Sequence, residues 1–561
     1  MEILKNKGFY ASLFLIIVLG IFLRLNEFSE VGYWTDDEAT IPAGLMWFYP
    51  QPYFPGLNYG NPPLADLIVG AGCMLSREDF SGVSNIKPFF YPDRFYYIGP
   101  GLANANFQCH LPMYAFGLIF FFLIIYFSLA FFNKYSALFL ISFFAFSPEI
   151  LKYSRWIKPE IILWTFTLLS FIFFLKGYKE DKFSKKEKIY LSLSFLSIGL
   201  AFASKFSIAF MVMIYFVLIL KKYSREILQI LSILTKKLNI TLLRGEEINK
   251  EACFNFFKLI LLLITTYIIS FLIFFKLNPK NFFDTYTSYQ NINQNLASSN
   301  FKFNNLFEYL QALLLKLNLL DTILFIFAFY LYFKLIKKEE KSKLELFILF
   351  LAPVSFILAL FFPVFITPYR TMPYLLGFIF LVSLSFSKLS PLNKINNKYV
   401  LLIILIYSLF SFYNAFSLSP NFENKNPIIC SLQPETCRYL DLGYSLKQTA
   451  DYLKNNLEDN ETFIGSEGVL FFYLRHSQGI LDWNFHQAFI RQLGREPTLP
   501  EKIQYFRPEN QTVRYLLLNP SPRERFEEAK EFKKTFQPNH IIKIKGKDAM
   551  YIYDLKNLKP R

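Results

Sequence analysis

The chain has 561 residues, of which 53% are hydrophobic and only 18% are charged, and it contains 69 phenylalanines and 35 tyrosines. This composition excludes an ordinary soluble globular protein and indicates a polytopic membrane protein. The net charge of +16 does not indicate a nucleic-acid partner, because the basic residues lie in short loops between apolar segments, as membrane topology requires.

Apolar segments long enough to cross a bilayer, at about 20 residues each, recur along the first three quarters of the chain. The first ends without a small-residue cleavage site, so we expect a retained helix rather than a signal peptide. Residues 189–220 form either one long helix or two short helices hinged at Ser204-Lys205. The other expected spans lie near residues 9–25, 111–132, 135–151, 157–176, 253–276, 311–333, 344–366, 369–387 and 398–416.

The basic loops decide how residues 189–220 are arranged. Loops 176–188, 221–251 and 334–345 contain six, seven and five Lys or Arg residues, respectively. The positive-inside rule places all three on the cytoplasmic side, which requires an even number of crossings between the first two. The sequence therefore predicts about eleven transmembrane helices within residues 1–418, with the C-terminus outside the cytoplasmic membrane.

From about residue 419 the hydropathy falls, and the pattern becomes that of a soluble domain. Ser445 and Gln448 form a capping pair that opens a helix with an apolar face. Strand-like segments and a hairpin follow, so residues 419–561 are expected to form an extracytoplasmic α/β domain. The apolar face is Leu446, Ala450, Leu453 and Leu457; the strands are 462–465, 513–518, 541–544 and 549–553; a further helix is expected to open at Ser521-Pro522.

Cysteine positions agree with this topology. Cys73, Cys109, Cys430 and Cys437 fall outside the membrane, whereas Cys253 begins a helix on the cytoplasmic side. Two external disulfides and one free thiol suit an oxidising compartment. The alternative is that all five cysteines are unpaired small residues.

An acidic triplet lies in residues 26–110, a loop of 85 residues that is too long for a simple connector. Asp36, Asp37 and Glu38 are consecutive, and clustered carboxylates raise one another's pKa and cost free energy when buried. They are therefore candidates for proton transfer or cation binding. The structural alternative is a capping box formed by Thr35 and Glu38, with the aspartates at the positive end of a short helix.

Four further groups fall on the same outer face. Singly, each has a structural explanation, because Glu160 can complement a helix N-terminus, and Lys205 and Arg370 can reach lipid headgroups. Together, two acidic motifs and two cations favour a site that joins an acceptor to a phosphate-bearing lipid. The groups are Asn61-Pro62-Pro63-Leu64, the stretch from Ser147 to Glu160 with Arg155 and Lys158, Lys205, and the stretch from Pro368 to Pro373 with Arg370.

This order of motifs resembles the GT-C superfamily of membrane glycosyltransferases over residues 9–418, and more weakly in the C-terminal domain. It is most similar to the bacterial branch related to dolichyl-phosphate-mannose protein mannosyltransferases and to the aminoarabinose transferase of lipid A. Members transfer one sugar from a polyprenyl-phosphate donor to an acceptor on the outer face of the membrane. The resemblance implies three partners: a polyprenyl-phosphate-linked sugar, membrane lipids, and an acceptor lipid, glycan or protein.

The resemblance also implies roles for the acidic residues. The family's Asp-Glu pair falls on Asp37 and Glu38, with Asp37 as the base that takes the acceptor hydroxyl proton. Asp36 is an additional acid that, with Glu38, raises the pKa of Asp37. Glu160, with Arg155 before it, occupies the second acidic motif, where many members have Asp.

The cations fall where relatives contact the donor phosphate. Arg370, Lys205 and Lys158 would stabilise the phosphate leaving group, and the guanidinium fork of Arg370 suits a phosphate. A single displacement would invert the anomeric centre. Relatives differ in their use of a divalent metal, and no ligand set in the sequence demands one. The alternative function is a lipid or sugar-lipid flippase, which the absence of inverted repeats disfavours.

Overall fold

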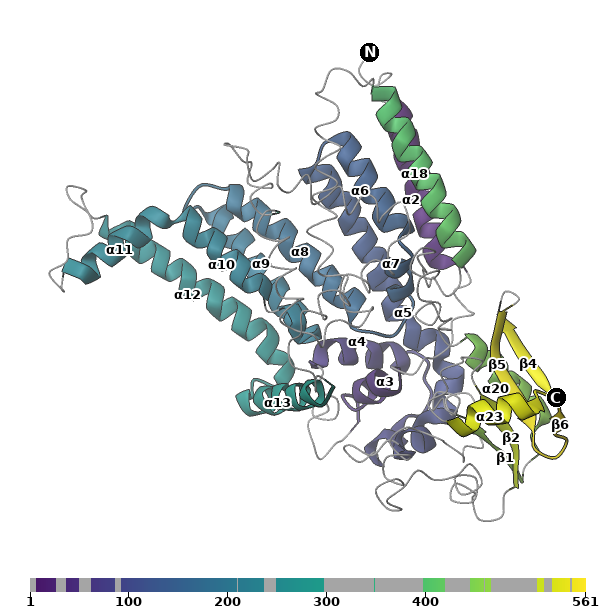
Figure 1. Cartoon of the computed structure of the whole chain (residues 1–561). Helices are drawn as coiled ribbons and strands as arrows, with labels where there is room; N and C mark the ends of the chain where they lie inside the picture. The colour runs from purple at the N-terminus through teal and green to yellow at the C-terminus, as the bar shows by residue number, and fades with distance from the viewer. Residues whose placement is uncertain are drawn as a thin grey trace.

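The protein is a helical bundle that carries a small C-terminal sheet (Figure 1). The computed structural model describes residues 7–26, 37–49, 62–85, 92–208, 210–236, 249–296, 348, 397–418, 444–458, 460–465, 512–518, 527–544 and 547–561. Several predicted features lie outside these ranges: Asp36, Arg370, Cys430, Cys437, the helix at Ser521, the spans near 311–333 and 369–387, and all but residue 348 of the span near 344–366.

Five helices of the described part are long and apolar enough to cross a membrane, judged by length and composition. Each overlaps a segment that the sequence predicts to be a span, and the predicted fold class, a helical polytopic membrane protein with a C-terminal α/β region, is confirmed. The total of eleven helices and their sidedness stay predictions. The five spans are Lys7–Leu25, Asn104–Phe131, Glu160–Lys179, Lys250–Phe275 and Tyr399–Leu418.

Side-chain caps fix the start of several helices. Asn133, Ser184 and Asn249 each accept a hydrogen bond from the backbone N–H three residues later. In chain order the helices are α2 Lys7–Leu25, α3 Asp37–Leu45, α4 Pro63–Met74, η3 Ser81–Asn85, α5 Pro92–Phe131, α6 Lys134–Phe146, α7 Pro148–Tyr153, α8 Glu160–Lys179, α9 Lys185–Ser204, η4 Phe206–Ile208, α10 Phe210–Lys222, α11 Ser224–Lys236, α12 Lys250–Leu272, η5 Ile273–Phe275, α13 Pro279–Leu296, α18 Asn397–Leu418, α20 Tyr444–Asn456 and α23 Glu527–Thr535.

Two apolar segments of the bundle contain a break. The hinge expected at Ser204-Lys205 is confirmed, because α9 ends at Ser204 and Lys205 has extended backbone angles. The segment expected near 135–151 is not one helix, since α6 stops at Phe146 and α7 starts at Pro148. A proline disfavours helical angles at the residue before it, and Ser147 is extended, with φ −65° and ψ 116°.

The long first loop contains a compact layer of helices, α3 and α4, that packs against α5. A Cβ atom at Gly44 would lie 2.1 Å from the carbonyl oxygen of Asp66, and one at Gly70 would lie 2.2 Å from that of Gly44. The two helices therefore cross in direct backbone contact. A disulfide joins Cys73 of α4 to Cys109 of α5, which favours the paired alternative for these two cysteines, and Cys253 is a buried free thiol.

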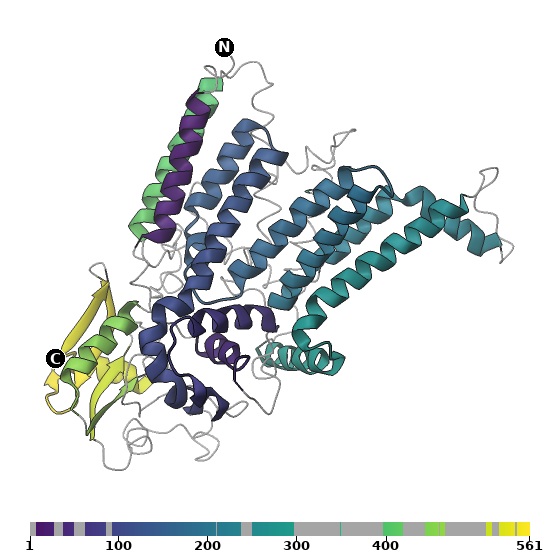
Figure 2. The same cartoon turned by 180° about the vertical axis from the view of Figure 1, so that it is seen from behind.

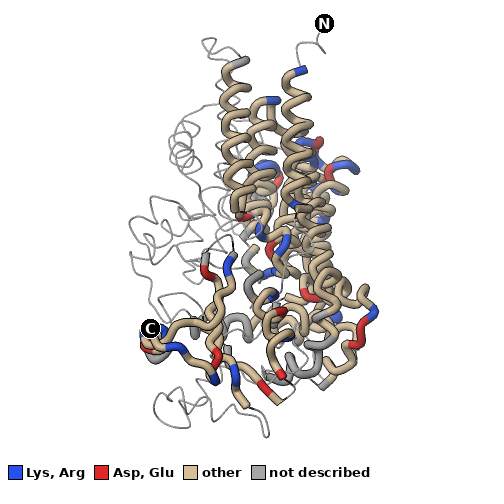
Figure 3. The backbone as a smooth tube through the Cα atoms, turned by 90° about the vertical axis from the view of Figure 1, so that its right-hand side faces the viewer, with Lys and Arg blue, Asp and Glu red and all other residues tan. Residues whose placement is uncertain are grey.

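The first and last described helices of the bundle, α2 and α18, lie side by side (Figures 1 and 2). The rings of Phe22 and Phe416 stack at 6.3 Å, and Ser408 Oγ donates a hydrogen bond of 2.8 Å to Ser142 Oγ on α6. Figure 3 shows that the long helices carry few charges along most of their length, as a membrane-spanning bundle requires.

At one end of α8, α9 and α10, ion pairs close the bundle. Glu187 is fully buried and accepts hydrogen bonds from Lys222 Nζ and Tyr223 Oη, both at 2.6 Å. Lys182 pairs with Glu226 at 2.8 Å nearby. These groups lie in the basic region that the sequence predicts to be cytoplasmic, at the far end of α9 from Lys205.

The C-terminal region forms a four-stranded sheet in the order β1-β2-β5-β4, and α20 packs against its β4 and β5 strands. β1 pairs parallel to β2, whereas β2–β5 and β4–β5 are antiparallel. The predicted helix is confirmed, with Leu446, Ala450 and Leu453 buried, and so are the predicted strands. The helix begins at Tyr444, so the predicted cap Ser445 lies inside it, and it ends at Asn456, before Leu457. The strands are β1 Glu461–Gly465, β2 Thr512–Leu518, β3 Phe536–Gln537, β4 His540–Ile544, β5 Lys547–Asp554 and β6 Lys559–Pro560.

A charged cluster fastens the edge of this sheet. Glu461 accepts hydrogen bonds from Arg514 at 2.7 Å and from Lys556 at 2.5 Å. Burial alone would raise the pKa of Glu461, but these hydrogen bonds outweigh burial and lower it to about 2. The cluster links β1, β2 and the turn after β5. The boundary of the predicted domain at residue 419 stays a prediction.

Candidate active site

The segment from the start of α7 to the first residue of α8 is short and buried, and it carries three of the eight predicted site residues: Arg155, Lys158 and Glu160. Pro148 opens α7, and Pro159 immediately precedes α8, so prolines fix both ends of the segment. Charged residues in such a turn would ordinarily face water. Here five of them are buried: Glu149, Lys152, Arg155, Lys158 and Glu160.

Glu160 and Lys205, both predicted site residues, form an ion pair. The Lys205 ammonium group donates a hydrogen bond to Oε1 of Glu160, and the two side chains are 13% and 4% exposed, respectively. Oε2 of Glu160 is also buried and accepts no hydrogen bond from the described residues. The pair connects the first residue of α8 to the break between α9 and α10. The ammonium group of Lys205 thus has a carboxylate partner inside the protein, which the headgroup alternative did not predict.

Lys158 lies beside this pair. Its Nζ is 3.6 Å from the centroid of the Trp156 ring, and its charge acts on Glu160. Its backbone N–H donates a 2.8 Å hydrogen bond to the Trp156 carbonyl oxygen, which tightens the turn. The structure therefore brings Lys158, Glu160 and Lys205 together, from positions up to 47 residues apart in the chain.

Arg155 contacts a different element. Its Nη2 donates hydrogen bonds to the carbonyl oxygens of Leu23, at 2.7 Å, and Asn26, at the C-terminal end of α2. Helix C-terminal carbonyls lack intrahelical partners and carry partial negative charge, so a buried guanidinium stabilises them. These contacts give Arg155 an anchoring role that its predicted place in an acceptor site did not include.

Arg24 strengthens the same anchor from the other side. It is 1% exposed, donates hydrogen bonds to the carbonyl oxygens of Phe144 at 2.9 Å and Ala145 at 3.2 Å, and lies 4.3 Å from the Phe121 ring centroid. Together the two arginines tie the end of α2 to α6 and to the α7–α8 turn. The chain therefore leaves α2 toward the acidic triplet from a fixed point.

Asp37 and Glu38 are the first two residues of α3. Figure 1 places α3 and α4 at the ends of α8 and α9 where Glu160 and Lys205 lie, and α4 contacts α9. A helix start at Asp37 puts Asp37 and Glu38 in the first turn, where a carboxylate suits the positive end of the helix, and it agrees equally with a catalytic role, so both interpretations stay open. Asp36 and Arg370 lie outside the described residues.

Three buried charged residues of this region, Arg24, Lys152 and Asp66, were not predicted from the sequence. Lys152, 1% exposed, lies 5.2 Å from the Trp156 ring, so Lys152, Arg155 and Lys158 form a series of cations at every third position. This three-residue spacing of the cations was the sequence signal that could have identified Lys152. Asp66 is the one acid in the apolar helix α4, where burial raises its pKa well above the usual range.

Among the described residues, no group of three or more His, Cys, Asp or Glu side chains lies close enough to hold a metal ion. The side chains of the acidic triplet are not among those described. Metal use by this site therefore stays open.

Residues 102–242 match the family profile of the dolichyl-phosphate-mannose-protein mannosyltransferases. This segment includes α6 to α10 and hence Arg155, Lys158, Glu160 and Lys205. No curated protein sequence matches the chain at a significant level.

Two solved structures share the fold over nearly the whole chain. ArnT from Cupriavidus metallidurans in the apo state is 12% identical, covers 97% of this chain and 98% of its own, and superimposes with a TM-score of 0.50. The same protein bound to undecaprenyl phosphate is 11% identical, covers 96% and 97%, and also gives a TM-score of 0.50. The predicted resemblance is thereby confirmed, and the chain has the fold of the GT-C membrane glycosyltransferases.

Proposed function

We propose that the protein is a membrane glycosyltransferase that moves one sugar from a polyprenyl-phosphate donor to an acceptor on the outer face of the cytoplasmic membrane. The observation that carries the proposal is the cluster of Lys158, Glu160 and Lys205 at the end of the bundle where α3 and α4 lie; Lys158 and Glu160 are buried and Lys205 is 13% exposed. Its support is the mannosyltransferase profile across this segment and the shared fold with an ArnT that was crystallised with undecaprenyl phosphate.

The lysines suit a phosphate leaving group. An ammonium has three N–H donors, and Glu160 takes one of those of Lys205. In a water-poor site, the positive charge of Lys158 and Lys205 stabilises the charge that develops as the glycosidic bond to phosphate breaks. Arg370 would add its guanidinium fork to the same phosphate.

The acid at the start of α3 would complete the reaction. Asp37 would take the proton of the acceptor hydroxyl, with Asp36 and Glu38 raising its pKa, and the hydroxyl would attack from the face opposite the phosphate, which inverts the anomeric centre. Arg155 serves this step as an anchor, because it fixes the end of α2 from which the acidic segment starts.

A flippase is the alternative function. A carrier that exposes its site alternately to both sides places its charged groups near the bilayer midplane, between helices that rock. Here the cluster lies at the ends of α8 and α9 and locks them together by an ion pair. This placement favours transfer chemistry at one membrane face.

The test is binding of undecaprenyl phosphate and turnover of a polyprenyl-phosphate sugar by purified protein. Lys158→Met and Lys205→Met keep the apolar stems but remove the charge, and each should weaken binding about tenfold or more, in keeping with a lost charge-assisted hydrogen bond. Lys182→Met is the matched control, because Lys182 also pairs with a glutamate but at the other end of the bundle. Equal binding by all three variants would refute the proposed donor site.

A further inference from the structure

The helix α3, which starts at Asp37, is seated on α4 by two glycines. A Cβ atom at Gly44 would lie 2.1 Å from the carbonyl oxygen of Asp66, and one at Gly70 would lie 2.2 Å from that of Gly44. Both obstructions are backbone atoms, which cannot rotate out of the way as a side chain can. A side chain at Gly44 or Gly70 would therefore push the two helices apart.

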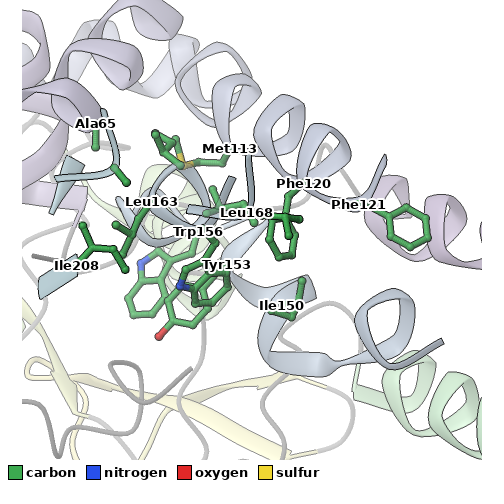
Figure 4. Close-up of a cluster of buried hydrophobic side chains, with 14 of the residues drawn as sticks. Ala65, Met113, Phe120, Phe121, Ile150, Tyr153, Trp156, Leu163, Leu168 and Ile208 are labelled. Carbon is green, nitrogen blue, oxygen red and sulfur yellow. The ribbon is translucent and has the colours of Figure 1, made fainter. Parts of the chain in front are cut away.

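The helix α4 is itself held from two directions. The disulfide between Cys73 and Cys109 ties its last turn to α5. Ala65, in its first turn, is 1% exposed and belongs to the buried apolar cluster of Figure 4, together with Leu163 of α8 and Ile208 of η4. The helix α4 is thus fixed against the bundle, and within the described residues α3 packs mainly on α4.

The same apolar cluster contains close neighbours of the ion pair. Leu163 follows Glu160 by three residues, and Ile208 follows Lys205 by three residues. In addition, α4 contacts α9, the helix that ends next to Lys205. The helix that supports α3 is therefore packed against the elements that carry the ion pair.

A displacement at the crossing would be transmitted to the start of α3. Asp37 lies seven residues before Gly44, which is about 10 Å along an α-helix. To relieve a Cβ contact of 2.2 Å to the 3.4 Å of an ordinary contact, the helices must separate by about 1 Å, and because α4 is held, the movement falls on α3. A misplacement of about 1 Å can lower the rate of an enzyme by about 10²-fold.

We infer that Gly44 and Gly70 are positioning residues, whose crossing on the disulfide-held α4 sets where Asp37 lies relative to the ion pair at the start of α8. This inference rests on the proposed function, because Asp37 is the proposed base. Neither glycine would touch the donor or the acceptor. Their role is to keep α3 so close to α4 that the acid meets the acceptor hydroxyl at hydrogen-bond distance.

The experiment compares turnover with donor binding by full-length protein in lipid nanodiscs. Turnover is the release of undecaprenyl phosphate from an undecaprenyl-phosphate sugar, chosen by screening hexose and pentose donors on the unmodified protein with membrane lipid extract as the source of acceptor. Binding is the Kd for undecaprenyl phosphate. Gly44→Ala and Gly70→Ala should each lower kcat about 10²-fold without weakening binding, because Lys158 and Lys205 lie outside α3 and α4.

Two controls show whether the loss of turnover comes from Asp37. In the Asp37→Asn background, Gly70→Ala should lower kcat little further, because the group that it displaces is already gone. Gly177→Ala is the matched control for a crowded helix crossing. Its Cβ would lie 3.0 Å from Leu191 Cγ, between α8 and α9 and at the end of α8 opposite Glu160. It should change Tm but leave kcat unchanged.

The outcomes separate failure of the inference from failure of the proposed function. If folded Gly44→Ala and Gly70→Ala keep the kcat of the unmodified protein, the glycines do not position the acid, although Asp37 stays the candidate base. The same conclusion follows if Gly177→Ala lowers kcat as much as they do. Full activity in Asp37→Asn would remove the proposed base, and the inference with it.

A variant that leaves the crossing intact covers the case in which both glycine variants fail to fold. Cys73→Ala/Cys109→Ala releases the last turn of α4 from α5. In the folded double variant kcat should fall without weaker binding of undecaprenyl phosphate, because α3 and α4 can then move together against the bundle. An unchanged kcat would overturn the inference.

Discussion

Variants of the ion pair between Glu160 and Lys205 should show that folding stability and donor binding depend on the pair in different ways. Both side chains are nearly inaccessible, at 4% and 13% exposure, so the pair behaves as a buried one. Removing one partner of such a pair leaves an uncompensated buried charge and costs about 3–5 kcal/mol. Glu160→Gln should be the more damaging single change, because it leaves Lys205 beside Lys158, whereas after Lys205→Met the charge of Lys158 still partly compensates Glu160.

The double variant Glu160→Gln/Lys205→Met contains no uncompensated charge from the pair. Its stability should therefore return most of the way to that of the unmodified protein, in keeping with neutral replacements of buried pairs. Its donor binding should stay weak, because the cation at the phosphate is missing. The assay is thermal unfolding of purified protein, read together with undecaprenyl phosphate binding on the same samples.

Lys182→Met supplies the reference for an exposed pair. The Lys182 side chain is 38% exposed, so its pair with Glu226 should contribute only about 0–1 kcal/mol. The reasoning would be refuted if the double variant were as unstable as Glu160→Gln alone, or if Lys182→Met were as damaging as Lys205→Met. Normal donor binding by the stable double variant would refute the functional part.

Three further predictions concern separate parts of the chain. Thiol counting in denaturant without reductant should find Cys73 and Cys109 unreactive, and Cys73→Ser should cost up to about 4 kcal/mol by loop closure across 36 residues of sequence separation. The pKa of Glu461 is lowered in the folded state from 4.5 to about 2. Its contribution to the free energy of unfolding, at most about 3 kcal/mol, is therefore present above pH 4.5 and is lost as the pH falls toward 2. In Glu461→Gln the free energy of unfolding should depend less on pH in this range. Asp37→Asn should lower turnover by about 10² to 10⁴ if Asp37 is the base, but leave turnover almost unchanged if it only supports the start of α3, because a charge at a helix N-terminus contributes about 0.3–1 kcal/mol to stability and nothing to the reaction.

For each of these three predictions, one outcome would contradict it. Five reactive thiols would rule out the bridge between α4 and α5. A Glu461→Gln protein whose unfolding keeps the full pH dependence between pH 4.5 and 2 would show that the hydrogen bonds to that carboxylate do not control acid stability. Full activity in Asp37→Asn would leave Glu38 or Glu160 as the candidate base.

Sequence patterns predicted the features that depend on the spacing of neighbouring residues and on the distribution of basic loops. The break at Lys205 followed from the parity of crossings that two basic loops impose, and the structure has the break at that residue. The apolar face of the helix at residues 444–456 followed from its spacing. Pro148 was also visible, but the apolar run around it suggested one span, and the rigid ring of proline proved stronger than the hydropathy of its neighbours.

Features that depend on distant contacts could not be predicted in this way. Arg155 donates to Leu23, 132 residues earlier in the chain, and no local pattern pairs a basic residue in a turn with the end of a remote helix. Burial of Lys152 and Lys158 against Trp156 likewise depends on how α5, α7 and α8 close around the turn. The sequence identified Arg155 and Glu160 but not Lys152, and only the packing separates an anchor such as Arg155 from the ion pair of Glu160 and Lys205.

The balance of buried charges at this end of the bundle relates the anchoring arginines to the proposed transfer reaction. Among the described residues of this region, the side chains of Arg24, Lys152, Arg155 and Lys158 are buried together with the carboxyl groups of Asp66, Glu149 and Glu160, and Lys205 adds a further cation. Buried charge of one sign is costly unless it is compensated. Two sources of negative charge suit it: the acidic triplet of this chain and the phosphate of the donor.

If both act in turn, the donor phosphate replaces the triplet as the partner of the cations. Asp37 would then be released from a positive neighbourhood when the donor binds, which raises its pKa and makes it a better base at the step that needs one. The donor affinity of Asp37→Asn tests this exchange, because removal of a competing carboxylate should tighten binding of undecaprenyl phosphate even as turnover falls. Unchanged affinity would mean that the triplet and the phosphate occupy separate places, and that the cations serve the donor alone.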